Sequence, residues 1–223
     1  MNNSYVFPPE QKEGVYRAIM QRRDIRAQFT EDPVSDALLN KLLRAAHHAP
    51  SVGFMQPWNF LVIRDPATRQ RVHQGFEKAH AQSAEMFPGD KKETYRSLKL
   101  EGIREAPVNL LITCDRERTG PVVIGRTVQP EMDLYSTVCA VQNLWLAARA
   151  EGIGVGWVSI LHEQELRDIF SLPDCVAVIA YLCIGHVSHF PDMPELEKAG
   201  WLPRLDLDAL VFYEQWGKTA AGK

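Results

Sequence analysis

Hydrophobic positions recur with helical and strand spacing along the chain. Helical spacing predicts a helix after Ser35, whose hydroxyl suits an N-cap, and Pro50 ends that helix. Further helices are predicted over residues 16–23, 65–87 and 163–170. Runs of β-branched and aromatic residues predict strands over residues 59–63, 107–114, 153–159 and 176–184. Strands interleaved with helices in this way indicate an α+β or α/β chain, and we expect a single domain over residues 1–223.

The strongest helical pattern runs from Asp133 to Glu151, and its apolar residues occupy two faces. One face carries Leu134, Val138, Val141, Trp145 and Ala148, and the other carries Tyr135, Cys139 and Leu146. A helix that is apolar nearly all round is buried either in the centre of the core or in a subunit interface. Gly152 follows it where a C′ glycine belongs.

Three segments between these elements are predicted to be irregular. Prolines and a glycine restrict residues 50–58, so we expect an ordered loop of fixed shape there. Ser51 and Gln56 would make it a ligand-binding lip, although an ordinary helix-to-strand connection fits the same pattern. Residues 88–105 are polar and form either a solvated excursion or a lid over a site. Residues 116–130 contain Gly120-Pro121, end at Pro130 and are predicted to be a loop.

Glycines alternate in one predicted strand, at Gly154 and Gly156. Their spacing removes side chains from one face, which would let a flat ligand lie against the backbone. A bulge or a barrel corner is the alternative interpretation. The spacing does not match a dinucleotide fingerprint, and these glycines follow a helix rather than open one.

Composition narrows the class of protein. A net charge of −3 argues against a general nucleic-acid binder, and 223 residues suffice for one well-filled core. The four cysteines lack paired or zinc-like spacing, so we expect free thiols and no metal. The polar segment 1–13 does not resemble a signal peptide, and no apolar run is long enough to span a bilayer. We therefore expect a cytoplasmic protein with no membrane partner.

Arginines cluster in residues 22–26, which read Arg-Arg-Asp-Ile-Arg and are called the arginine segment below. Guanidinium groups suit phosphate oxygens and stay charged at any working pH. Asp24 among them is either a neutralising partner or a working acid/base beside an anionic ligand. A solvated, charged helix end is the alternative for the whole segment.

Four motifs resemble the FMN-dependent nitroreductase superfamily in order and separation across almost the whole chain. They are Arg22-Arg23-Asp24-Ile25-Arg26, Pro50-Ser51 with Gln56-Pro57-Trp58, Gly154-Val155-Gly156-Trp157, and Pro203-Arg204-Leu205. The first motif of that superfamily usually reads Arg-Arg-Ser-x-Arg, and here Asp24 replaces the serine. Together with Trp157-Val158-Ser159 and residues 47–60, this replacement resembles the flavin-destroying branch of the superfamily.

The resemblance implies an α+β nitroreductase-like fold, with a central mixed β-sheet flanked by helices, in an intertwined homodimer. Two FMN sites would lie at the interface, with Ser51 and Gly53 reaching the flavin of the partner subunit. Arg22, Arg23 and Arg26 would hold the phosphate and ring edge, with Arg204 as a further phosphate contact. The implied cofactor-binding set is Arg22, Arg23, Asp24, Ile25, Arg26, Ser51, Gly53, Gln56, Trp157, Ser159, Leu161 and Arg204.

The implied reaction consumes reduced FMN, supplied by a separate flavin reductase, with O₂. Its products are 5,6-dimethylbenzimidazole, the lower ligand of cobalamin, and erythrose 4-phosphate. Asp24 would transfer a proton and Ser159 would position it or the reacting ring atoms. The alternative for Asp24 is simple ion pairing with Arg23 or Arg26. The alternative for Ser159 is a strand-end hydroxyl that binds the backbone. Two other functions remain open, an NAD(P)H-dependent nitroreductase or flavin reductase and a non-catalytic flavin-binding protein.

Overall fold

A computed structural model describes residues 5–219, and they fall into two compact units that divide after Phe190. The first four residues of the segment 1–13 lie outside the described range. The smaller unit holds α7 (Glu195–Lys198) and the 3₁₀ turn η2 (Leu207–Leu210). The larger unit contains the sheet and every site residue named above except Arg204. That residues 1–223 form a single domain stays a prediction.

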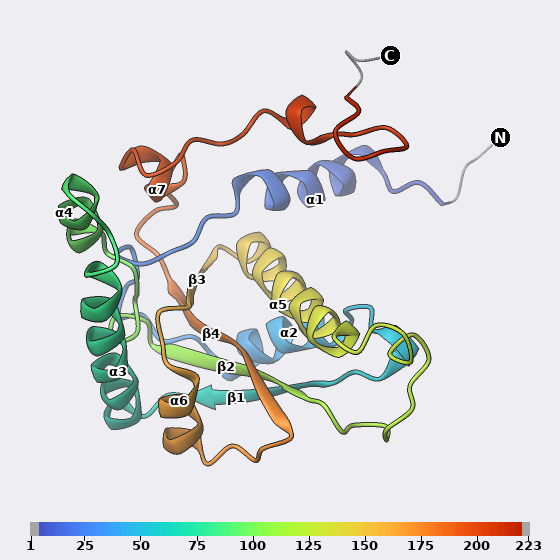
Figure 1. The fold of residues 1–223 in the computed structure, drawn as a ribbon, viewed down its shortest axis with the longest axis horizontal. Helices are drawn as coiled ribbons and strands as arrows, with labels where there is room; N and C mark the ends of the chain where they lie inside the picture. The colour runs from blue at the N-terminus through green and yellow to red at the C-terminus, as the bar shows by residue number, and fades with distance from the viewer. Residues whose placement is uncertain (1–4, 220–223) are drawn as a thin grey trace. The chain divides into compact units, whose positions relative to one another are not determined.

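One four-stranded sheet organises the larger unit (Figure 1). Its strands are β1 (Trp58–Ile63), β2 (Val108–Asp115), β3 (Ile153–Val158) and β4 (Val176–His186), in the order β1-β2-β4-β3. All three strand pairings are antiparallel, so the expectation of a mixed sheet needs correction within one chain. Among the described residues, parallel pairing is confined to an isolated bridge between Asp24 and Val155.

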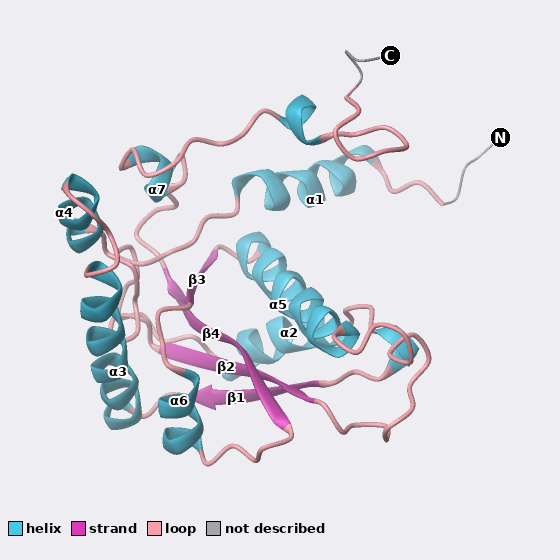
Figure 2. Ribbon diagram, viewed as in Figure 1, coloured by secondary structure: helices cyan, strands magenta, loops and turns pink. Residues whose placement is uncertain are grey.

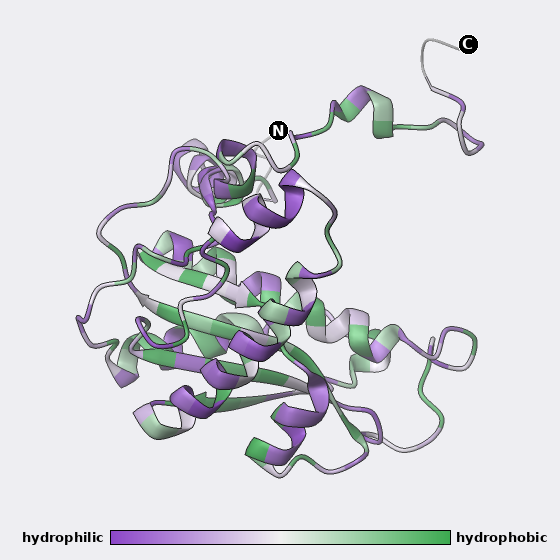
Figure 3. Cartoon of the chain, turned by 60° about the vertical axis from the view of Figure 1, so that its left-hand side comes forward, coloured by the Kyte–Doolittle hydropathy of each residue, from purple (hydrophilic) through white to green (hydrophobic). Residues whose placement is uncertain are grey.

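Helices cover both faces of the sheet (Figure 2). The helices of this unit are α1 (Pro9–Gln21), α2 (Asp36–His47), α3 (Pro66–Ala84), α4 (Asp90–Ser97), α5 (Met132–Ala150) and α6 (Glu163–Phe170). Alternate residues of β2 point to opposite faces, because successive strand side chains alternate. Leu110 and Ile112 therefore pack with α2 and α5, whereas Leu111 packs with α3 and α6. The strands are predominantly hydrophobic, as the two-sided burial requires (Figure 3).

Local sequence signals predicted most element boundaries correctly. The Ser35 hydroxyl accepts a hydrogen bond from the Leu38 N–H at 3.2 Å, which confirms the predicted N-cap of α2. Gly152 follows α5 with φ of +72°, which confirms the C′ glycine. The first helix begins at Pro9, well before the predicted start at residue 16, and none of its residues is buried. The polar stretch 88–105 contains α4, which was not predicted.

Burial of α5 is one-sided in a single chain. Eight of its residues are buried against α2 and the sheet. Tyr135 is nevertheless 58% exposed and Val138 41% exposed. Tyr135 and Val138 belong to different predicted apolar faces of the helix, so burial in the core of one chain leaves part of each face uncovered.

Candidate functional site

The arginine segment lies along the free edge of β3. The Ile25 N–H donates to the Val155 carbonyl oxygen at 3.0 Å, next to the parallel bridge between Asp24 and Val155. The Ile25 side chain is fully buried. Further on, the Thr30 N–H donates to the His186 carbonyl oxygen at 2.9 Å, at the end of β4. Main-chain hydrogen bonds therefore fix the whole run from Asp24 to Thr30 against the sheet.

The alternating glycines make room for this segment. A Cβ at Gly156 would overlap the Ile25 carbonyl oxygen, and one at Gly154 would overlap the Val187 side chain and contact Ile25. The face cleared by the two glycines is thus filled by the chain itself. The interpretation that a flat ligand lies there is wrong, because Ile25 and Val187 of the chain occupy the cleared space.

Gly156→Ala is expected to destabilise the protein by about 1–3 kcal/mol, the usual cost of forcing an extra carbon into a packed site. The new Cβ must displace Ile25 and with it Asp24. Chemical denaturation measures the effect. Gly14→Ala is the matched control, because a Cβ in α1 meets nothing within 4 Å and alanine favours a helix. Equal stability of the two variants would contradict the close packing at Gly156.

Three hydrogen bonds fix the carboxylate of Asp24. Its Oδ1 accepts from the Trp157 N–H at 2.9 Å. Its Oδ2 accepts from Nε and Nη2 of Arg26, at 3.1 and 2.7 Å. The side chain of Asp24 is still 30% exposed. The structure therefore confirms that Asp24 pairs with Arg26, and it leaves the carboxylate within reach of a ligand.

The other two arginines of the segment lie beside the C-terminal half of α5. The guanidinium carbon of Arg22 lies 4.6 Å from the centroid of the Trp145 ring, a cation–π arrangement. The Trp145 indole N–H donates to the Arg23 carbonyl oxygen at 3.3 Å. Nη1 of Arg23 donates to the carbonyl oxygens of Met20 and Arg22, at 3.0 and 2.8 Å. The segment thus places the cation of Arg22 over an aromatic ring and holds the Arg23 side chain against the main chain at the end of α1.

Ser159 lies just beyond the backbone amide that binds Asp24. It follows β3 directly and is exposed. With Trp157 and Leu161 it lines a cavity of about 290 Å³ between the end of β3, α6 and β4, whose other walls are mostly apolar. Trp157 also faces Trp145, with 6.2 Å between ring centroids. The structure therefore brings the arginine segment and residues 157–161 together, as the sequence suggested.

The loop over residues 50–58 is ordered, as predicted, and is held by α5 and by a second loop. The Val52 N–H donates to Ser136 Oγ, and the Gln56 N–H donates to Ser51 Oγ, both at 3.1 Å. Gly53 has a φ of +59°, and a Cβ there would meet the Val123 side chain at 2.5 Å. A glycine is required here both for the backbone conformation and for space.

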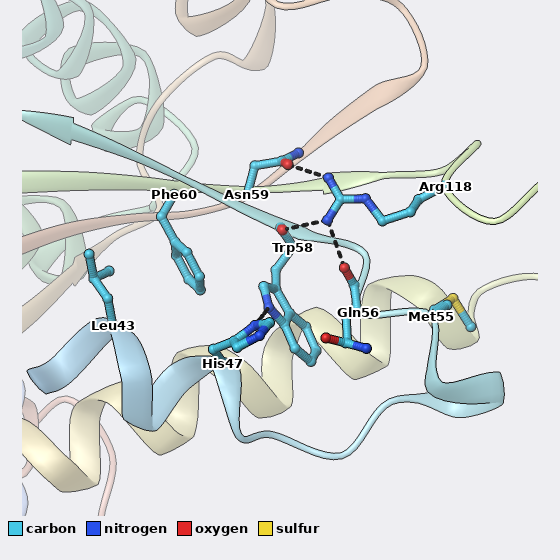
Figure 4. Close-up of a pocket in the computed structure, with 8 residues that line it drawn as sticks. All are labelled: Leu43, His47, Met55, Gln56, Trp58, Asn59, Phe60 and Arg118. Carbon is cyan, nitrogen blue, oxygen red and sulfur yellow. Dashed lines mark hydrogen bonds between the residues drawn. The ribbon is translucent and has the colours of Figure 1, made fainter. Parts of the chain in front are cut away.

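Arg118 is the residue of this region that the sequence did not single out. It donates to the carbonyl oxygens of Gln56 and Trp58, at 2.8 and 3.0 Å, and to Oδ1 of Asn59 (Figure 4). It thereby fastens the loop to β1 at one wall of a cavity of about 670 Å³. His47 on the opposite wall accepts from the Trp58 indole N–H at 3.1 Å. No local pattern marks Arg118, since its partners lie about 60 residues away in sequence.

The two groups of predicted flavin contacts lie along different halves of α5. The loop over residues 50–58 is tied to Ser136, whereas the arginine segment is tied to Trp145. Nine residues of α-helix separate these anchors, which corresponds to roughly 14 Å along its axis. Arg204 belongs to the smaller unit, where it is exposed and its N–H donates to the Glu197 carboxylate at 3.3 Å. The predicted flavin-binding residues therefore do not all lie together within one chain.

The four cysteines are free, and burial raises the pKa of Cys114 and Cys183, so these two thiols stay protonated near neutral pH. Over residues 5–219, no group of three or more metal-ligating side chains is found. In the same range, no helix is long and apolar enough to cross a membrane.

Comparison with known proteins agrees with this geometry. The model of the nitroreductase family matches residues 19–186, from the end of α1 to the end of β4. The chain belongs to the nitroreductase family. A 5,6-dimethylbenzimidazole synthase of Rhodospirillum rubrum is 39% identical over 92% of this chain and 96% of its own length. A second protein of that name, from Rhodobacter capsulatus, is 34% identical over 89% and 96%.

Solved structures share the fold of this chain. An iodotyrosine deiodinase bound to FMN and 3-iodo-L-tyrosine superimposes with a TM-score of 0.71 at 21% identity, over 91% of this chain and 100% of that one. A nitroreductase-like protein from Desulfovibrio desulfuricans in complex with FMN has a TM-score of 0.64 at 24% identity, over 95% and 99%. The predicted nitroreductase-like fold is confirmed.

Proposed function

We propose that this protein fragments reduced FMN with oxygen, giving 5,6-dimethylbenzimidazole and erythrose 4-phosphate. We place the reaction in the cytoplasm, where a separate flavin reductase supplies reduced FMN. The observation that carries the proposal is the carboxylate of Asp24, which stands where the superfamily usually has a serine and is fixed by Trp157 and Arg26. The similarity to proteins named 5,6-dimethylbenzimidazole synthase over nine-tenths of the chain supports it.

The side chains at the candidate site suit a flavin nucleotide. Arg22 and Arg23 offer cations to the phosphate, and the cavity beside Ser159 offers apolar walls to the ring. Trp157 and Leu161 line the same cavity. Ile25 would contribute main chain only, because its side chain is fully buried. We propose Arg204 as a further phosphate contact.

Asp24 and Ser159 are the groups we assign to the chemistry. Asp24 accepts a proton from the substrate, and Ser159 positions Asp24 or the reacting ring atoms. Arg26 keeps the carboxylate in one orientation through two hydrogen bonds, in addition to its predicted flavin contact. Bound reduced flavin supplies both the electrons that reduce oxygen and the ring carbons of the product.

A homodimer would complete the site. Exposed apolar side chains lie on α1, on α5 and on the two loops near Gly53, and they include Tyr16, Ile19, Met20, Phe54, Ile124, Tyr135 and Val138. Such a surface is typical of a protein–protein interface. Because the loop over residues 50–58 is tied to the far half of α5, we propose that Ser51, Gly53 and Gln56 serve the flavin of the partner subunit.

Val138→Asp is expected to convert a dimer into a monomer and to weaken FMN binding together with it, because an isolated carboxylate is costly to bury in an interface. Analytical ultracentrifugation at micromolar concentration, with flavin fluorescence, measures both. Met86→Asp is the control, since Met86 is also exposed but follows α3 on the other face of the sheet. A native monomer that binds FMN tightly would rule out the shared site.

The proposed function is tested by mixing the protein with chemically reduced FMN and air, followed by mass analysis of the small molecules. We expect 5,6-dimethylbenzimidazole and erythrose 4-phosphate in proportion to the FMN consumed. Quantitative return of oxidised FMN without the benzimidazole would overturn the proposal. Turnover with NAD(P)H under the same conditions would then favour a nitroreductase or flavin reductase, and flavin binding without turnover would favour a binding protein.

A further inference from the structure

A turn of the polar stretch 88–105 packs behind Arg26. Nη1 of Arg26 donates to the Lys99 carbonyl oxygen at 3.3 Å. A Cβ at Gly102 would lie 2.8 Å from the Arg26 carbonyl oxygen and 2.6 Å from the ring of Phe29. Residues 99–103, called the 99–103 turn below, are therefore in close contact with the segment that carries Arg26. The guanidinium of Arg26 binds this turn on one side and Asp24 on the other.

A buried carboxylate holds this turn in shape. Glu101 is only 3% exposed, and its Oε2 accepts from the Ile103 N–H at 2.7 Å. Its Oε1 accepts a short hydrogen bond from Nζ of Lys99. His73 of α3 lies behind it, with Nε2 3.8 Å from the same oxygen. Glu101 thus connects the Lys99 side chain at one end of the turn to the Ile103 N–H at the other.

Glu105 offers a natural comparison. It also accepts from Nζ of Lys99, at 2.8 Å, but its side chain is 36% exposed and binds no backbone group of the turn. Burial disfavours the charge of Lys99, yet the hydrogen bonds that its ammonium donates to both carboxylates outweigh burial and raise the Lys99 pKa overall. The ammonium therefore stays charged at working pH, and Glu101 keeps its partner.

We propose that Glu101 is a positioning residue, which acts through the 99–103 turn and Arg26 on the carboxylate of Asp24. The path runs from Glu101 to the turn, from the Lys99 carbonyl to Arg26, and from Arg26 to Asp24. It rests on the proposed function, in which Asp24 accepts the proton. Misplacing a reacting group by about 1 Å can reduce a rate by on the order of 100-fold, so a residue remote from the ligand can control the reaction.

The first test is kinetic and uses a double-mutant cycle. Glu101→Gln keeps the shape of the side chain and removes the charge that holds Lys99. We expect product formation at saturating reduced FMN to fall roughly 10- to 100-fold, with FMN affinity changed less than about twofold. In an Asp24→Asn background the same change should have almost no further effect, since Glu101 acts through Asp24. Additive losses, or a loss confined to FMN affinity, would overturn the proposal.

The second test needs no activity and therefore separates this inference from the proposed function. The Trp157 N–H is protected by Asp24, so Glu101→Gln should speed its hydrogen exchange, measured by NMR, by roughly tenfold. Amides in the paired β1 and β2 strands should keep the wild-type rate, which distinguishes local loosening from global instability. Glu105→Gln should leave both exchange and activity near wild type. Unchanged exchange at Trp157 in folded Glu101→Gln would overturn the inference, whether or not the wild type forms the benzimidazole.

Discussion

Asp24→Asn is expected to lower the formation of 5,6-dimethylbenzimidazole by roughly two to four orders of magnitude, the usual contribution of a placed general acid/base. The amide has the size of the carboxylate but cannot accept a proton at working pH. FMN should still bind, since the cations of Arg22 and Arg23 are unchanged. The measurement is product yield against time at saturating reduced FMN, with air admitted to start the reaction.

Asp24→Ser provides a control that Asp24→Asn cannot provide. An asparagine at this position keeps a single acceptor oxygen, whereas Asp24 uses one oxygen for Trp157 and the other for Arg26. Serine is the residue usual at this position in the superfamily that the sequence resembles, and it is compatible with a flavin site. We expect this variant to bind FMN and return it oxidised. Near-normal benzimidazole yield from both variants would make Asp24 a structural partner of Arg26 alone.

Ser159→Ala should show a milder form of the same behaviour. Ser159 is exposed beside the cavity, two residues from the Trp157 amide that binds Asp24, and takes part in none of the three hydrogen bonds that fix Asp24. Loss of the hydroxyl therefore keeps those three bonds and removes one polar contact near the carboxylate and the ring. A rate at saturating reduced FMN that equals wild type would make Ser159 a strand-end residue without a role in the reaction.

Patterns of short range in the sequence predicted most of the fold. The helix over residues 163–170 was located from its spacing alone, and Ser35 identified the start of α2. These features depend on neighbours within about four residues, where capping and periodicity act. The start of α1 was missed for the same reason: the helix buries none of its residues, so it lacks the periodic signal of a packed face.

Features that depend on distant parts of the chain could not be predicted. The alternation of Gly154 and Gly156 is plain in the sequence, but what occupies the cleared space is decided by Ile25. Arg118 is one of three arginines in an irregular loop, and only the fold brings it to Gln56 and Trp58. The family motif located the arginine segment, whereas Glu101 behind it belongs to no motif. A single sequence does not show which residues far apart along the chain come into contact.

Arg22→Ala is expected to weaken FMN binding by about 1.5–3 kcal/mol, the range for hydrogen bonds to charged groups, which is roughly 10- to 150-fold in dissociation constant. The guanidinium lies over Trp145 in the free protein, so the ring holds the cation in place before the ligand arrives. The phosphate does not react, and its contact is equally strong in the ground state and the transition state. The rate at saturating reduced FMN should therefore stay close to wild type.

Two further variants separate charge from geometry in this prediction. Arg22→Lys keeps the positive charge but loses the planar fork, so an intermediate affinity would assign part of the effect to two-pronged phosphate contact. Arg17→Ala removes an arginine one turn earlier on α1, where its Nε donates to Gln21 at 3.3 Å, and should leave the affinity unchanged. Flavin fluorescence titration at fixed ionic strength compares all three. A saturating rate that falls with Arg22→Ala, at unchanged affinity, would move Arg22 from phosphate binding into the reaction itself.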